Sequence, residues 1–206
     1  MHRRTALSVS AALLLAAPLL SACSGEARPG TAAVVGGERI TTSALQAQVK
    51  DVRAAQRRTD NPAQQIAASS HLERIKLSRM VQLRILERAA DGAGVTVTTK
   101  EIGEVAKRQL AQAGGDPAQM EKLLLAQRTP LAPDQADDEI RFQLLYGKLV
   151  EHDGEQKAMA RLAEAARQLH IEINPRYGAW DAKQITLGEG RTPWITQKTR
   201  TEEPQA

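Results

Sequence analysis

Few groups in this chain could perform chemistry, and the first of them is its only cysteine, Cys23. A single thiol allows no disulfide within the chain and no thiol cluster that could bind a metal ion. Cys23 follows an apolar run over residues 7–20, which is preceded by His2, Arg3 and Arg4. The run is shorter than the about 20 apolar residues that a membrane-spanning helix needs. A charged start, a short apolar core and small residues at its exit are instead typical of a secretory signal peptide.

The stretch LSAC at residues 20–23 resembles a lipobox, the signal of bacterial lipoproteins. The resemblance implies cleavage between Ala22 and Cys23, with diacylglycerol attached to the sulfur of Cys23. The alternative is an ordinary signal peptide with a chance cysteine beside its cleavage site. Lipidation would explain the lone cysteine of an exported protein, because its thiol would no longer be free. We therefore expect a signal peptide over residues 1–22 and a lipid anchor that holds the protein on the extracytoplasmic face of the cell membrane.

Residues 23–31 contain small residues and a proline, which is typical of a tether. At about 3.5 Å per residue, this segment could hold a domain at most ~30 Å from a bilayer. Cleavage after Ala22 would remove Arg3 and Arg4, so that 28 basic residues fall to 26 against 24 acidic residues. This near balance, without a basic stripe interleaved with aromatic residues, argues against nucleic acid as a partner.

Two further stretches are candidates for chemistry. His152 beside Asp153 could form part of a metal site or an acid–base pair, but we expect adjacent side chains at a helix end to diverge. The acidic run 137–139 could bind a cation, although acidic residues are common at helix N-termini because they interact favourably with the helix dipole. The chain has no phosphate-binding loop, serine-nucleophile motif or Cys/His cluster. We therefore predict no catalytic residue, no metal site and no cofactor.

The elements that would position these groups are mostly helices, because the chain is rich in Ala, Gln, Leu and Arg and has only five aromatic residues. Two β-prone runs on either side of Gly36-Gly37 predict a hairpin over residues 32–40. Capping residues, glycines and prolines delimit helices over residues 43–58, 62–90, 98–112, 116–129, 133–152 and 155–170. Short strands are expected over residues 171–173 and 183–187.

Local patterns add detail to four of these helices. Ser43 with Gln46, and Thr98 with Glu101, have the spacing of a capping box. The helix over 62–90 has apolar residues on nearly all sides, which indicates several packed neighbours with arginine stems lying over apolar surface. The last helix has a one-sided apolar stripe, made of Met159, Leu162, Ala163, Ala166 and Leu169.

Three pieces of the chain together resemble the SurA N-terminal domain of exported bacterial chaperones, a group that includes SurA, trigger-factor-like and PrsA-like foldases. They are AAVVGGERIT at 32–41, ILERAADGAGVTVTTKEI at 85–102 and INPRYGAWD at 173–181. Gly36-Gly37 replaces the Asn-Gly that is usual in the family, and both pairs tolerate a positive φ. The resemblance implies a mainly α domain with a small β element formed by N- and C-terminal segments. We assign it residues 32–190, followed by a loose polar tail over 191–206.

The resemblance implies a membrane-anchored chaperone that binds unfolded exported polypeptides without ATP and without catalysis. Many family members insert a prolyl isomerase domain between their last two helices, but the corresponding junction here is only residues 152–154. Two alternatives stay open. One is an adaptor lipoprotein that binds a single envelope partner. The other is a prolyl isomerase. Its only candidate catalytic groups near the turn at Asn174-Pro175 are the side chains of Glu172, Asn174 and Tyr177. The sequence does not predict the oligomeric state.

A chaperone surface needs exposed apolar side chains that adapt to varied clients, and methionine and leucine meet this need. The candidates for peptide binding are Met80, Met120, Leu123, Leu124, Leu125 and Met159. Each of them could instead belong to the core, where most such side chains lie. Tyr177 and Trp180 could clasp an extended client peptide, or they could lock the Asn-Pro turn onto the helices by burying a large area.

Overall fold

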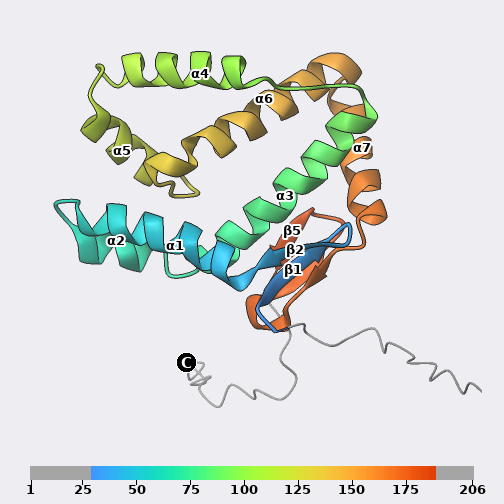
Figure 1. The fold of residues 1–206 in the computed structure, drawn as a ribbon, viewed down its shortest axis with the longest axis horizontal. Helices are drawn as coiled ribbons and strands as arrows, with labels where there is room; N and C mark the ends of the chain where they lie inside the picture. Colours follow the sequence, from blue (N-terminus) through green and yellow to red (C-terminus); the bar gives the residue numbers. More distant parts are fainter. Residues whose placement is uncertain (1–28, 189–206) are drawn as a thin grey trace, which may run out of the picture.

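The computed structural model describes residues 29–188, which form seven α-helices, two short 3-10 helices and five short strands (Figure 1). The predicted mainly α fold with a small β element is confirmed. The predicted signal peptide, Cys23, most of the tether and the polar tail lie outside the described residues. No helix within residues 29–188 is both long and apolar enough to cross a membrane.

The predicted hairpin is confirmed and forms part of a three-stranded antiparallel sheet. Its strands are β1 (Thr31–Val35) and β2 (Glu38–Thr41), and β3 (Glu172–Ile173) pairs with the other edge of β1. Gly36 and Gly37 have φ angles of 60° and 82°, which glycine adopts without a steric penalty. The N-terminal strand therefore meets the C-terminal part of the chain, as the family resemblance implies.

The C-terminal strands differ from the prediction of one strand over 183–187. Two strands, β4 (Ala179–Asp181) and β5 (Thr186–Gly188), form a separate antiparallel pair. Asp181 closes the turn between them, because its carboxylate accepts hydrogen bonds from the backbone N–H groups of Lys183 and Gln184 at 2.9 and 3.1 Å. The segment at 183–185 is thus a turn, and the strand begins only at Thr186.

The first helix, α1 (Thr42–Arg57), begins earlier than expected. Thr41, the last residue of β2, caps it by accepting a hydrogen bond from the backbone N–H of Ala44 at 3.0 Å. The predicted cap at Ser43 with Gln46 is therefore wrong. The hairpin runs directly into the helix, so the first residue that can cap it is Thr41.

The predicted helix over 62–90 is two helices, α2 (Pro62–Ala68) and α3 (Leu72–Gly92). The break lies at Ser69, whose hydroxyl donates back to the carbonyl of Gln65 at 2.9 Å. Arg53 of α1 donates to the carbonyl and to the hydroxyl of Ser69 at 2.7 and 2.6 Å. Side-chain hydrogen bonds of this kind compete with the helical pattern and end α2.

Helix α3 is the centre of the fold and packs against α1, α6, α7, β1 and β5, as its all-round apolar pattern predicted. The main core gathers around it, with large buried side chains at Leu45, Leu77, Val81, Ile85, Leu86 and Leu149. A smaller core joins α1, the start of α3 and α5, and consists of Val52, Ala55, Leu72, Leu125 and Ala132.

The remaining helices are α4 (Thr99–Gln112), α5 (Pro117–Leu125), α6 (Ala136–Asp153) and α7 (Glu155–Gln168), with a 3-10 turn at Pro133–Gln135 before α6. The capping box of Thr98 with Glu101 is confirmed, and Asp116 caps α5 by accepting a hydrogen bond from the backbone N–H of Ala118. We call α4, α5 and the first half of α6 the arm. In Figure 1 the arm lies on the side of the molecule away from the sheet.

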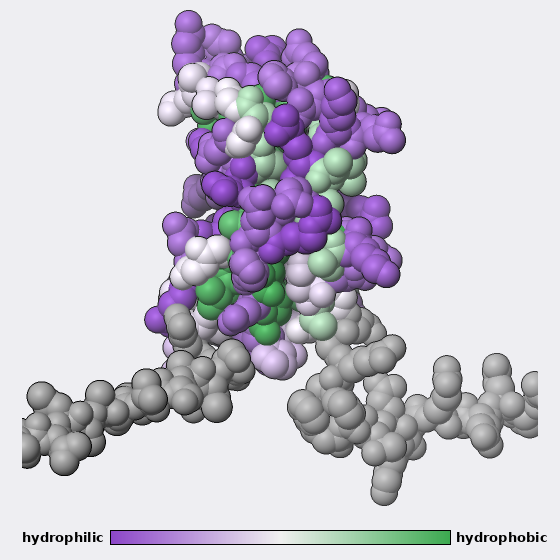
Figure 2. Space-filling model, turned by 90° about the vertical axis from the view of Figure 1, so that its right-hand side faces the viewer, coloured by the Kyte–Doolittle hydropathy of each residue, from purple (hydrophilic) through white to green (hydrophobic). Residues whose placement is uncertain are grey.

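The buried side of α7 is rotated from the predicted stripe. Its buried residues are Ala158, Leu162, Ala165 and Ala166, whereas Met159 is 46% exposed. Including Met159 in the buried stripe was therefore wrong. The face of the molecule in Figure 2 is mostly hydrophilic, and its apolar residues gather at the level of the sheet.

Candidate functional site

The predicted client-binding residues separate into buried, exposed and groove-lining positions. Leu124 and Leu125 are each only 3% exposed, whereas Leu123 is 47% exposed. Met80 and Met120 are half-buried and line two different hollows of the surface. The structure therefore brings Met120 and Leu124 together in one hollow and places Met80 in another.

The larger hollow, which we call the arm groove, has a volume of about 630 Å³ and runs between α4, α5 and the start of α6. Its apolar lining is continuous across these elements and comprises Leu110, Pro117, Met120, Leu124, Leu125, Pro133 and Ile140. Ion pairs stand at its rim, one of them Arg58 with Glu121 at 2.8 Å. This arrangement of apolar floor and polar rim suits an apolar ligand that remains partly in water.

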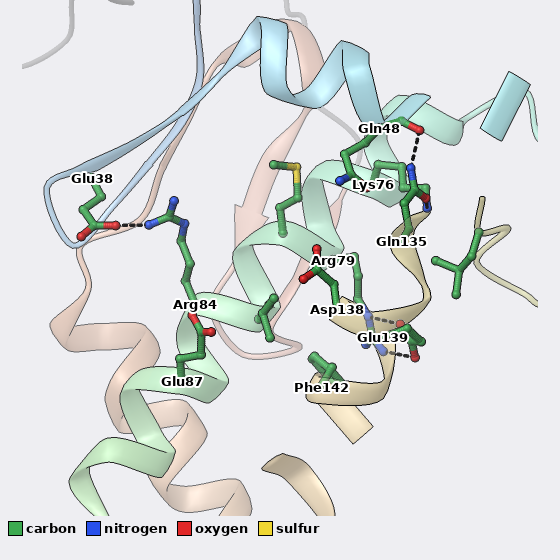
Figure 3. A pocket seen from close by; sticks show the side chains of 13 residues that line it. Glu38, Gln48, Lys76, Arg79, Arg84, Glu87, Gln135, Asp138, Glu139 and Phe142 are labelled. Carbon is green, nitrogen blue, oxygen red and sulfur yellow. Dashed lines mark hydrogen bonds and ion pairs between the residues drawn. The ribbon is translucent and has the colours of Figure 1, made fainter. Parts of the chain in front are cut away.

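The smaller hollow, which we call the central cleft, has a volume of about 400 Å³ and lies between α1, α3 and α6, with the hairpin turn at one end (Figure 3). Its apolar lining consists of Met80, Leu83, Leu131 and Phe142. Arg79 lies over the ring of Phe142, 3.3 Å from the ring centroid, and binds both carboxylate oxygens of Glu139 at 2.5 and 3.0 Å. A second ion pair, between Arg84 and Glu38, joins α3 to the hairpin.

A lysine lies almost completely buried in the lining of the central cleft. Lys76 is 2% exposed, and its ammonium donates to the side-chain oxygen of Gln135 at 2.5 Å. Gln135 in turn donates to the backbone carbonyl of Gln48 at 2.8 Å, so that the network ties α3 and the 3-10 turn to α1. Burial lowers the pKa of Lys76 to about 8, because the charged form loses hydration; nearby Glu139 partly opposes this shift.

Lys76 was not predicted as a site residue from the sequence. The signal was present, because Lys76 stands four residues after Leu72 and four before Met80, between two apolar residues on one side of α3. A charged residue in such a stripe is seldom fully buried unless it is paired.

The sequence model of the SurA-like N-terminal domain matches residues 4–150, more than half of the chain. The chain belongs to the SurA-like N-terminal domain family. This confirms the resemblance and assigns the chain to a family of chaperone type. No curated protein and no solved structure matches the chain. The match ends in α6, so α7 and the C-terminal strands of this SurA-like protein lie beyond it.

The aromatic residues of the C-terminal turn face inward in this SurA-like protein. Tyr177 is buried in the main core, and Trp180 is half-buried against it. The Tyr177 hydroxyl and the Trp180 indole N–H have no hydrogen-bond partner among the described residues. Asn174, one of the groups considered for isomerase chemistry, instead donates its side-chain N–H to the carbonyl of Thr31 at 3.0 Å.

The two helix-end candidates lie at opposite ends of α6. His152 and Asp153 do not diverge as expected, because His152 Nδ1 lies 2.9 Å from an Asp153 carboxylate oxygen. Arg161 also binds Asp153 and, with His152, holds the pKa of this carboxyl below its usual range. The run 137–139 occupies the first turn of α6. No group of three or more His, Cys, Asp or Glu residues that could hold a metal ion occurs within residues 29–188.

Proposed function

We propose that this protein is a membrane-anchored extracytoplasmic chaperone that binds unfolded exported polypeptides without ATP and without catalysis. The observation that carries the proposal is the arm groove, an open apolar surface on a domain of a chaperone-type family. Leu110 and Met120 line this groove, and Leu123 is exposed on the same helix as Met120. Exposed apolar surface of this kind normally marks a binding site.

The chemistry of the groove fits varied clients. Met120 has a flexible, polarisable side chain that can repack around ligands of different shape. No charged side chain of the described residues is buried within the groove, and its ion pairs lie at the rim. Binding there therefore depends on apolar area, with little demand for a particular sequence.

The proposed anchor orients the arm groove away from the membrane. Pro29 lies six positions after Cys23, so a lipid on Cys23 would hold the start of the sheet within ~20 Å of the bilayer. The arm is on the opposite side of the molecule from the sheet (Figure 1). An anchored domain would then present its groove to chains that emerge into the extracytoplasmic space.

The test is suppression of aggregation by the mature chain without its lipidated cysteine, residues 24–206, mixed at near-equal concentration with several unrelated unfolded exported proteins. We expect reduced light scattering for each client and no acceleration of prolyl isomerisation in a short peptide. Met120→Gln places a polar group in the groove and should weaken the suppression severalfold. Met159 was also a candidate for peptide binding, but it lies on α7 outside the arm groove. Met159→Gln is therefore the control and should leave the suppression unchanged.

Absence of suppression across all clients would overturn the chaperone proposal. In that case the adaptor alternative gains support if crosslinking in intact cells captures one folded envelope partner.

A further inference from the structure

The central cleft has a feature that the arm groove lacks, a buried cation without a carboxylate partner. Gln135 is the only hydrogen-bond partner of Lys76 among the described residues, although an ammonium group has three N–H donors. Buried charges are normally paired, because an unpaired charge costs much free energy. The remaining donors of Lys76 are therefore available to an acceptor that enters the cleft.

One carboxylate of the cleft also lacks a partner. Glu38, Glu87 and Glu139 each form an ion pair with an arginine. The fourth carboxylate, Asp138, has neither an ion pair nor a hydrogen bond among the described residues. Figure 3 shows the Asp138 side chain pointing into the cleft.

The charges around the cleft select the kind of ligand. Arginines neutralise Glu38, Glu87 and Glu139, so the charges that remain are those of Lys76 and Asp138. The cleft then has no net charge that would attract an anion, and a neutral acceptor suits Lys76. A peptide carbonyl is a neutral acceptor that every polypeptide carries. Asp138 then offers its charge to a basic side chain of the same ligand, while Met80, Leu83 and Phe142 offer apolar contact.

We infer that the central cleft is a second peptide-binding site, specific for an extended apolar segment that carries a basic residue. A main-chain carbonyl of the segment accepts a hydrogen bond from Lys76, and its basic side chain pairs with Asp138. The inference rests on the proposed function, because the segment would be part of an unfolded client. It adds charge selectivity to the unselective binding in the arm groove.

The experiment uses two fluorescent nonapeptides with the same apolar sequence, one with lysine and one with glutamate at the central position. Binding to the mature chain is measured by fluorescence anisotropy at low ionic strength, where charge effects are largest. We expect the lysine peptide to bind about tenfold more tightly than the glutamate peptide, a ratio within reach of one charge pair. Asp138→Lys should reverse this preference.

Asp91→Lys is the matched control, because Asp91 is exposed on α3, undergoes the same change of charge and lines neither the central cleft nor the arm groove. This variant should keep the preference for the lysine peptide. Lys76→Met should weaken binding of both peptides by a similar factor, because it removes the carbonyl contact. Asp138 is exposed on the first turn of α6, so its variant tests the inference even if the Lys76 variant fails to fold.

Equal binding of the two peptides, or an Asp138→Lys variant that keeps the lysine preference, would overturn the inference. Tighter binding of the glutamate peptide would identify an anion site at Lys76 and would overturn it as well. Either result leaves the chaperone proposal standing if the chain still suppresses aggregation. Loss of that suppression in the unmodified chain would instead refute the proposed function itself.

Discussion

At the scale of single residues, Lys76 combines a cost in stability with a position suited to binding. Its pKa in the folded protein is about 8, below the ordinary value of 10.5. Between these two values the unfolded chain binds more protons than the folded one, so the free energy of unfolding rises as the pH rises. The full penalty of burying the charge is present below pH 8, and it disappears above the ordinary pKa.

Lys76→Met should therefore stabilise the protein at pH 7, by about 1–3 kcal/mol, because an apolar side chain of similar length replaces a buried charge. In the unmodified chain, the free energy of unfolding should rise between pH 8 and 10.5, by at most about 1.4 kcal/mol per pH unit. This rise should be absent in the variant, which has no titrating group at position 76. Urea unfolding of both proteins between pH 7 and 10 measures both effects. An equal pH dependence in the two proteins would contradict the assignment to Lys76.

The candidate site could be predicted from the sequence only in part. Met80, Met120 and Leu124 were predicted from residue type, and they do line the two hollows. Lys76 and its partner Gln135 lie 59 residues apart, and their contact depends on how the 3-10 turn before α6 packs against α3. No pattern within either helix contains that information.

At the scale of elements, one lysine joins α4 to α6. Lys148 of α6 donates to the Glu101 carboxylate at 2.5 Å and to the carbonyl of Thr96 at 2.9 Å. The hydrogen bond from Lys148 is the main cause that lowers the pKa of Glu101 to about 2, and the capping bonds from Thr98 add to it. Through this pair the base of the arm is fixed to the rest of the domain.

Lys148→Met should raise the pKa of Glu101 toward its ordinary value of 4.5, although the capping bonds from Thr98 remain. A lowered carboxyl pKa gives stability that is present above about pH 4.5 and is lost as the pH falls toward 2. The variant should therefore show a weaker loss of stability over this range. NMR titration of the Glu101 carboxyl and acid unfolding measure the two effects.

Lys157→Met on α7 is the control for this prediction, because Lys157 is exposed and has no ion pair among the described residues. An unchanged Glu101 titration in Lys148→Met would mean that the capping bonds alone hold the pKa low.

The element boundaries show which signals are local. Thr98 with Glu101 was predicted correctly, since both capping partners lie within four residues. The break between α2 and α3 was missed, because Ser69 is bound by Arg53 from a different helix, 16 residues earlier. Sequence patterns thus predicted the hairpin and the cap at Thr98 but misplaced the cap of α1, whereas breaks imposed by tertiary contacts required the packed structure.

At the scale of the whole molecule, the fold is closed by segments beyond the family match. The match ends at residue 150, yet β1 pairs with β3, and α7 supplies Ala158, Leu162, Ala165 and Ala166 to the main core. The backbone N–H of Gly36 in the hairpin donates to the carbonyl of Leu169 at 2.6 Å. The N-terminal hairpin therefore depends on the C-terminal part for one strand, several hydrogen bonds and much of its apolar cover.

We expect a chain that ends at Val150 to lose cooperative unfolding, whereas a chain that ends at Gly188 should unfold with the same midpoint as the mature protein. Removing residues 151–188 exposes the α3 side chains that pack against α7, and it leaves an edge of β1 unpaired. Burial of apolar area is the main favourable contribution to folding, so a core opened on one side should not sustain a single transition. Thermal unfolding followed by circular dichroism compares the three chains, and a sharp transition in the shorter one would show that the matched segment is an independent folding unit.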